Sequence, residues 1–241
     1  YGAAENGLDG HNAYGKNVVF KTNNLEQHIV PFKGAFESQV AAVMPTYSVL
    51  KGVDWKGKSP EPVAAGYSHF LLTDLLRGEY NFKGVIISDW LITNDCDNEC
   101  LNGAPEGKKP VTGGMPWGVE SLTKEQRFVK AIHAGIDQFG GVTDSDIITG
   151  AVGKGLVTES RINESAKRIL IQKFELGLFE QPYVDAGNAE KIVGREETQK
   201  EANLAQMHSL VLFRTSISFL SNREPVSGFM APKPQRQRRQ G

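Results

Sequence analysis

The sequence carries almost no net charge, has few cysteines and lacks a long apolar run. Its 27 basic and 28 acidic residues give a formal net charge of −1, so charge alone favours neither nucleic acid nor an anionic membrane as a partner. No stretch of about 18 apolar residues occurs, which argues against a transmembrane helix. With 241 residues, of which 39% are hydrophobic, the chain can form one large α/β domain or two smaller ones.

The start of the chain carries no recognisable leader. It begins at Tyr1, without an initiator methionine, a basic segment or an apolar segment. We therefore expect either a processed start or a piece of a longer protein. A secreted or periplasmic location is favoured over the cytoplasm.

The chain has two cysteines, Cys96 and Cys100, in one polar loop. They are compatible with a small disulfide in an oxidising compartment or with two free thiols. A zinc site would need further ligands, and no histidine lies in the neighbouring segment. We therefore expect no metal and no cofactor.

Short apolar runs alternate with amphipathic helical segments along the chain. Strands are predicted at 18–20, 40–44, 84–88 and 135–139, and helices at 25–36, at 67–80, after a capping box of Thr123 and Gln126, and twice more after residue 139. The last helix carries an apolar stripe of Ile162, Ala166, Ile169, Leu170 and Phe174. We expect Pro31 to bend or restart the first helix, and 46–66 to form a long irregular loop.

This alternation predicts an α/β fold with a parallel sheet of βα units. A closed (β/α)8 barrel needs eight strands and about 250 residues, so three or four strands predict the C-terminal portion of such a TIM-type barrel. We expect a partial barrel at 1–185, a helical exit or linker at 186–213, and an irregular basic tail at 214–241. Disorder is the expectation for the tail, with a nucleic-acid or targeting patch as the alternative.

The most apolar strand runs into Ser88, Asp89 and Trp90. In parallel βα architectures the active site lies at the carboxyl ends of the strands, and Asp89 is expected one residue beyond this one. Aspartate also caps turns, so both roles stay open on geometry alone. Trp90 fits either a core position or an aromatic wall, and a carboxylate beside an indole suits the apolar face of a sugar ring.

The segment "LLTDLLRGEYNFKGVIISDW" resembles the nucleophile region of glycoside hydrolase family 3, in which L-T-D-x-L-R and G-F-x-G precede S-D-W. Upstream, "AAVMPTYSVLKGV" resembles the family's V-M-x-x-Y-x-x-x-x-G segment. Downstream, "AIHAGIDQFGG" and "RILIQKFELGLFEQPYVD" resemble the closing strand of the barrel and the helix and exit that follow. The resemblance covers roughly residues 1–185.

The resemblance implies a retaining β-glycosidase of the β-glucosidase type, which acts on a β-linked oligosaccharide or an aryl or alkyl β-glucoside. Asp89 would be the nucleophile, with a second carboxyl group about 5–5.5 Å away as acid and then base. Tyr47, Trp90 and Met44 would contact the sugar, although each also fits simple packing at a strand end. No nucleic-acid or membrane partner is expected.

The chain also departs from the family pattern. Its opening, "YGAAENGLDGHNAYG", resembles the loop just after a Lys-His pair of the family, and the acid/base glutamate of many members comes from a following α/β sandwich domain that has no counterpart here. Because general acid–base help is worth about 10²–10⁴ in rate, we expect weak activity at best from this polypeptide alone. An oligomer or a missing complementary domain could complete it.

Two other functions stay open from the sequence. The first is a β-N-acetylglucosaminidase of the same family, because Asp9 and His11 resemble the Asp–His dyad of those enzymes. The second is a non-catalytic, degenerate fragment or a carbohydrate-binding remnant, which would explain the departures from the family pattern. The other polar residues are expected to have structural roles: a solvated loop for Asp95, Asp97 and Glu99, a helix surface or a structural ion pair for Asp74 with Arg77, a structural acid at Asp137, and no ligand role for His28, His69, His133 and His208.

Overall fold

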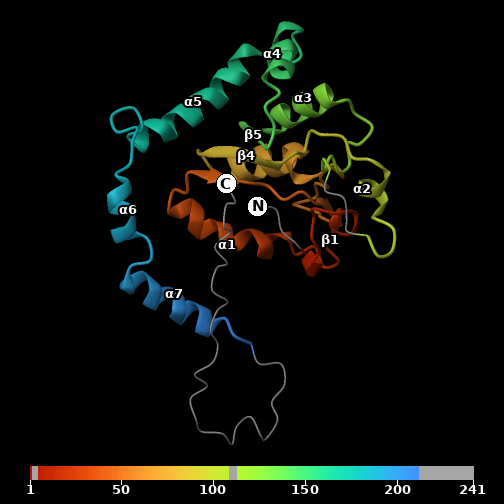
Figure 1. The fold of residues 1–241 in the computed structure, drawn as a ribbon. Coiled ribbons are helices and arrows are strands. Elements are labelled where there is room, and N and C mark those ends of the chain that lie inside the picture. The colour runs from red at the N-terminus through yellow and green to blue at the C-terminus, as the bar shows by residue number, and fades with distance from the viewer. Residues whose placement is uncertain (2–4, 109–112, 212–241) are drawn as a thin grey trace, which may run out of the picture. The chain divides into compact units, whose positions relative to one another are not determined.

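The computed structural model describes residues 1, 5–108 and 113–211 (Figure 1). The chain forms two compact units, Tyr1–Pro182 and a second unit that begins at Tyr183. The tail predicted at 214–241 lies outside the described residues.

The elements of the first unit are, in chain order, η1 (Glu5–Gly7), η2 (Ala13–Gly15), β1 (Asn17–Val19), α1 (Leu25–Glu37), β2 (Ala42–Val43), β3 (Val49–Lys51), η3 (Ala65–Tyr67), the π-helix η4 (Phe70–Glu79), β4 (Val85–Trp90), α2 (Asn98–Asn102), α3 (Lys124–Ala134), β5 (Gln138–Gly140), α4 (Ser145–Gly153) and α5 (Glu159–Glu175). The described part of the second unit holds α6 (Ala186–Ile192) and α7 (Glu196–His208).

All the strand pairs in the described residues are parallel, in an α/β arrangement. β1 pairs with β3, and a second sheet has the order β2-β4-β5. β4 is therefore the central strand of its sheet. In Figure 1, α1 and α3 lie on opposite sides of β4 and β5. Buried residues of the strands and helices form one main core that includes Ile86 and the leucines of η4.

The predicted loop 46–66 is partly wrong, because it contains β3. Val49 and Leu50 are buried and pair in parallel register with β1, Leu50 opposite Val18. The burial of two adjacent apolar side chains, and not an alternating pattern, gives this strand its stability.

The bounds of β2, β4 and β5 also differ from the prediction. β4 continues to Trp90, so Asp89 lies inside the strand. β2 is limited to Ala42–Val43, and the flanking Val40 and Met44 are exposed. β5 begins at Gln138 because Gly135, with φ of 126°, first ends α3.

The helices lie where they were predicted, with one correction at Pro31. The capping box of Thr123 and Gln126 is confirmed at the start of α3. Pro31 lies inside an uninterrupted α1, where burial of Leu25 and Ile29 offsets the lost backbone hydrogen bond. The stripe on α5 is only partly covered.

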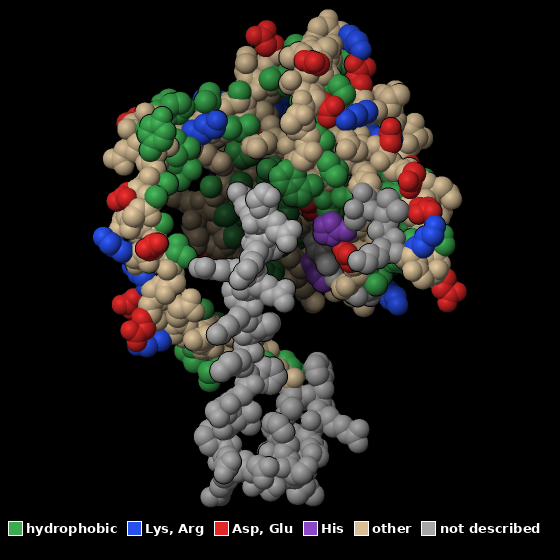
Figure 2. Space-filling model, in the orientation of Figure 1, with side chains coloured by type: hydrophobic (Ala, Val, Ile, Leu, Met, Phe, Trp, Pro, Cys, Tyr) green, Lys and Arg blue, Asp and Glu red, His purple; other side chains and the backbone are tan. Residues whose placement is uncertain are grey.

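On α5, Ile162 packs against a small core cluster with Ile132 and Val157. Further along, apolar side chains are exposed at the surface in and after α5 (Figure 2), namely Leu170, Ile171, Phe174, Leu176, Leu178 and Phe179.

Asp137 organises the amino ends of β4 and β5. Its side chain is 0% exposed and accepts hydrogen bonds from Arg77 (2.6 Å), Arg168 (2.7 Å), Ser165 (2.7 Å) and the backbone amide of Ile86 (3.0 Å).

A third guanidinium, that of Arg161, lies 3.5 Å from Asp137. The structural role predicted for Asp137 agrees with this burial. The predicted pairing of Asp74 with Arg77 is wrong, because Asp74 pairs with His69 instead, at 3.3 Å. A carboxylate with no solvent access is the stronger partner for Arg77.

Candidate active site

Asp89 lies near the carboxyl end of the central strand β4, with its side chain partly exposed. Its Oδ1 accepts a hydrogen bond from the backbone amide of Trp90 at 2.8 Å. Ser88 fixes the backbone beneath it, since Ser88 Oγ donates to the Asp89 carbonyl (2.8 Å) and accepts from the amide of Gly140 (2.9 Å) on β5. The carboxylate is thus oriented by main-chain contacts of two neighbouring strands.

Tyr47 lies beside this carboxylate. Its side chain is 3% exposed, and its hydroxyl donates to the Trp90 carbonyl at 2.8 Å. Burial raises the pKa of Tyr47 above its ordinary value, and the nearby Asp89 carboxylate raises it further. The phenol therefore keeps its proton at neutral pH and donates it to the Trp90 carbonyl.

The indole of Trp90 is 59% exposed and lies over two glycines that sequence reasoning missed. A Cβ on Gly140 would lie 3.0 Å from Trp90 Cε3, and one on Gly141, where φ is +70°, would lie 2.7 Å from the same atom. Only glycine leaves room for the ring here. In the sequence, two adjacent glycines at the end of a predicted strand could have indicated this close contact.

Met44 follows β2, the neighbour of β4. Val43 is opposite Ile86 in the register, so Met44 lies at the same edge of the sheet as Asp89, with its side chain 49% exposed. Asp89, Tyr47, Trp90 and Met44 therefore share one edge, while their roles toward a sugar stay predictions.

The loop of Asp9 and His11 reaches the same edge. The two rings of His11 and Tyr47 meet edge to face, with centroids 4.9 Å apart. His11 Nδ1 lies 2.6 Å from Asp9 Oδ1, and the backbone amide and ring of His11 lower the pKa of Asp9. Sequence reasoning named this pair only as an alternative.

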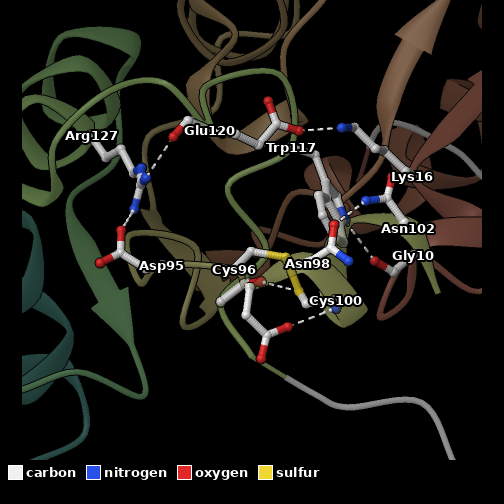
Figure 3. The surroundings of a disulfide bond; sticks show 12 residues. Gly10, Lys16, Asp95, Cys96, Asn98, Cys100, Asn102, Trp117, Glu120 and Arg127 are labelled. Carbon is white, nitrogen blue, oxygen red and sulfur yellow. Dashed lines mark hydrogen bonds and ion pairs between the residues drawn. A yellow bond between two sulfur atoms is a disulfide. The ribbon is translucent and has the colours of Figure 1, made fainter. Parts of the chain in front are cut away.

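The loop after β4 is closed by a disulfide of Cys96 and Cys100 (Figure 3), one of the two states that the sequence left open. Arg127 of α3 is buried and donates to the carbonyls of Thr93 and Glu120 and to Asp95 Oδ1, the last at 2.6 Å. Asp95 is exposed, as expected for an acid of a solvated loop, and is in addition paired with Arg127.

Two further contacts tie this region together. Asp97 caps α2 by accepting from the Cys100 amide at 2.8 Å, in addition to its expected place in a solvated loop. Trp117 Nε1 donates to the Gly10 carbonyl at 2.9 Å and so links the segment beyond the disulfide to the Asp9–His11 loop (Figure 3).

Removal of the disulfide is expected to lower the free energy of unfolding by about 2 kcal/mol, the chain-entropy value for a loop of this length. The change is Cys96→Ser with Cys100→Ala, since Cys100 is buried, and the measurement is urea unfolding. Dithiothreitol should destabilise the unsubstituted chain to the same extent and leave the variant unaffected. Equal stability of both proteins without reductant would contradict the prediction.

The described residues contain no cluster of three or more His, Cys, Asp or Glu side chains arranged to hold a metal ion. In the same part of the chain, no helix is both long and apolar enough to cross a membrane.

In parallel βα enzymes the active site lies at the carboxyl edge of the sheet, where this structure places Asp89 and the exposed indole of Trp90. Glycosidases act through carboxylates. Residues 1–171 match the family model of the glycosyl hydrolase family 3 N terminal domain. The chain belongs to glycosyl hydrolase family 3, as the sequence motifs predicted.

Named relatives agree with this assignment. The chain is 58% identical over 216 residues to a periplasmic beta-glucosidase/beta-xylosidase of Dickeya chrysanthemi, a match that covers 90% of this chain and 33% of the relative. It is 38% identical over 225 residues to a probable beta-glucosidase C of Aspergillus oryzae, covering 93% and 32%.

Among solved structures, a beta-glucosidase from Listeria innocua in complex with glucose matches with a TM-score of 0.62 and 27% identity, over 91% of this chain and 26% of that one. A mutant of that enzyme was solved with laminaribiose. The chain thus spans about a third of the length of the curated relatives it matches.

Proposed function

We propose that this chain is the nucleophile-bearing part of a retaining β-glucosidase. The observation that carries the proposal is the Asp89 carboxylate at the carboxyl end of β4, flanked by the buried hydroxyl of Tyr47 and the exposed indole of Trp90. Family membership and the relatives' names support hydrolysis of a terminal β-D-glucosyl residue.

In the proposed first step, an Asp89 oxygen forms a bond to the anomeric carbon while the bond from that carbon to the leaving oxygen breaks. The leaving oxygen takes a proton from a general acid. In the second step water attacks the same carbon, loses its proton to that residue, and releases Asp89 with the β configuration retained. Trp90 would cover the apolar face of the sugar, and Met44 would line the same edge.

The proposed roles of the neighbours follow from their contacts. Tyr47, which stays protonated, would turn its hydroxyl proton from the Trp90 carbonyl to the Asp89 carboxylate and stabilise the negative charge there as a neutral donor. The general acid would come from a segment outside the part of the longer relatives that these residues match. We accordingly propose weak activity for the isolated chain.

We further propose that the parallel strands form the C-terminal portion of a (β/α)8 barrel at 1–185, followed by a helical linker of which residues 186–211 are described. The likeness to the Listeria innocua enzyme supports this arrangement. A periplasmic or secreted location is supported by the name of the Dickeya chrysanthemi relative and by the disulfide, which persists in oxidising compartments.

The test compares the 241-residue chain with a chimera in which the chain replaces the segment that it matches in the Dickeya chrysanthemi enzyme. We expect the chimera to hydrolyse p-nitrophenyl β-glucoside, with β-glucose as the first product in proton NMR, and the chain alone to be far slower.

Three other results would contradict the proposal. Release of α-glucose would exclude a retaining mechanism. Preference for the p-nitrophenyl N-acetylglucosaminide would favour a β-N-acetylglucosaminidase that uses Asp9 and His11. Sugar binding by the chimera without turnover would favour a non-catalytic remnant. A parallel assay with p-nitrophenyl β-xyloside would define the sugar preference.

A further inference from the structure

The loop of Asp9, Gly10 and His11 is held rigidly against Tyr47. A Cβ on Gly10 would lie 3.2 Å from Tyr47 Cβ and 2.9 Å from Ser48 Oγ, so the loop backbone packs directly on this segment. From the other side, Trp117 Nε1 donates to the Gly10 carbonyl at 2.9 Å. The loop thus lies between Tyr47 and Trp117.

Internal contacts close the same loop. A Cβ on Gly15 would lie only 1.9 Å from the Asp9 carbonyl oxygen, and Ser48 Oγ donates to the Gly15 carbonyl at 2.8 Å. The Asp9 carboxylate accepts from the His11 amide (3.0 Å) and from Asn12 Nδ2 (3.3 Å). These contacts leave the loop little freedom before a ligand arrives.

The His11 ring is oriented by this frame. Its Nδ1 donates to Asp9 Oδ1 at 2.6 Å, which leaves Nε2 as the free nitrogen of the neutral ring. The ring is held edge to face on Tyr47, whose hydroxyl reaches the Trp90 carbonyl. An oriented acceptor therefore lies next to the nucleophile's tyrosine, and half of the His11 side chain is open to solvent.

We propose that His11 is a substrate-binding residue whose Nε2 accepts a hydrogen bond from a sugar hydroxyl, with Asp9 as the positioning residue that fixes the ring. This role rests on the proposed glycosidase function and assigns no proton transfer to His11. The hydroxyl belongs either to the glucosyl unit or to the sugar that leaves, and the test distinguishes the two.

Two variants distinguish the effect of the hydrogen bond accepted by the ring nitrogen from the effect of the packing of the ring. His11→Phe keeps the packing on Tyr47 and removes both nitrogens, while His11→Gln retains an acceptor near the position of Nε2. The matched control is His69→Phe, because His69 also pairs with an aspartate, Asp74, and is similarly exposed, but belongs to the turn before η4.

In the chimera, His11→Phe is expected to raise KM about tenfold, with kcat within twofold, since one hydrogen bond to a neutral acceptor is lost. His11→Gln should recover most of the loss, and His69→Phe should match the unsubstituted protein. A rise with both p-nitrophenyl β-glucoside and laminaribiose places the hydroxyl on the glucosyl unit, and a rise with laminaribiose alone places it on the leaving sugar.

An unchanged KM on both substrates would overturn the role, as would a loss confined to kcat on substrates with poor leaving groups, which marks an acid. If the unsubstituted chimera fails to cleave either substrate, the proposed function fails first. Laminaribiose binding to the 241-residue chain, followed by saturation-transfer NMR, then decides on His11: equal signals from the chain and its His11→Phe variant, or none from either, overturn the proposal.

Discussion

Replacement of Asp89 by alanine is expected to lower kcat/KM of the chimera for p-nitrophenyl β-glucoside by on the order of 10³-fold or more, which corresponds to about 4 kcal/mol of transition-state stabilisation. The Ala side chain cannot form the glycosyl–enzyme bond, so the double displacement loses its first step. Fold should be retained, because the Asp89 side chain accepts only from the neighbouring Trp90 amide among the described contacts.

Added azide distinguishes the loss of the nucleophile from misfolding of the variant, because only a folded active site can form the azide product. With 2,4-dinitrophenyl β-glucoside, which needs no acid, azide can attack the anomeric carbon from the side that the carboxylate vacates and yield α-glucosyl azide. Asp146→Ala, on exposed α4, is the matched control and should behave as the unsubstituted protein. Undiminished hydrolysis by Asp89→Ala would remove Asp89 from the nucleophile role.

Replacement of Asp137 by asparagine is expected to lower the free energy of unfolding of the chain by about 3–5 kcal/mol, as for the removal of one partner from a buried ion pair. Arg77, Arg161 and Arg168 would then face one another without the anion that now lies between them. Burial already lowers the pKa of Arg77 to about 10 against the opposing effect of Asp137, so the loss of Asp137 lowers that pKa further and weakens the folded state.

Urea unfolding followed by circular dichroism measures this effect. Asp74→Asn is the control, because Asp74 is also paired but lies at the surface, and its change should stay within about 0.5 kcal/mol. A loss below about 1 kcal/mol for Asp137→Asn would mean that the arginines find other partners and that the ends of β4 and β5 do not depend on this carboxylate.

Local signals in the sequence were sufficient to predict strand β4 and the family. The apolar run before Asp89 identified the strand, and the capping box identified the start of α3. In both cases the determining residues lie within a few positions of one another, where periodicity and capping act.

Contacts between distant segments could not be obtained in this way. Arg77 meets Asp137 across 60 positions, and β3 exists because it pairs with β1. The same holds in the site, where the glycines beneath Trp90 come from the next strand. Only tertiary packing selects one partner from several of similar chemistry.

The position of the Cys96–Cys100 bridge bears on how the protein matures. These are the two cysteines of the chain, and four positions separate them. Within these 241 residues one pairing is available, and the sulfur atoms can meet without prior formation of the sheet. Closure of this bridge therefore calls for an oxidant, and it can precede the folding of the rest of the chain.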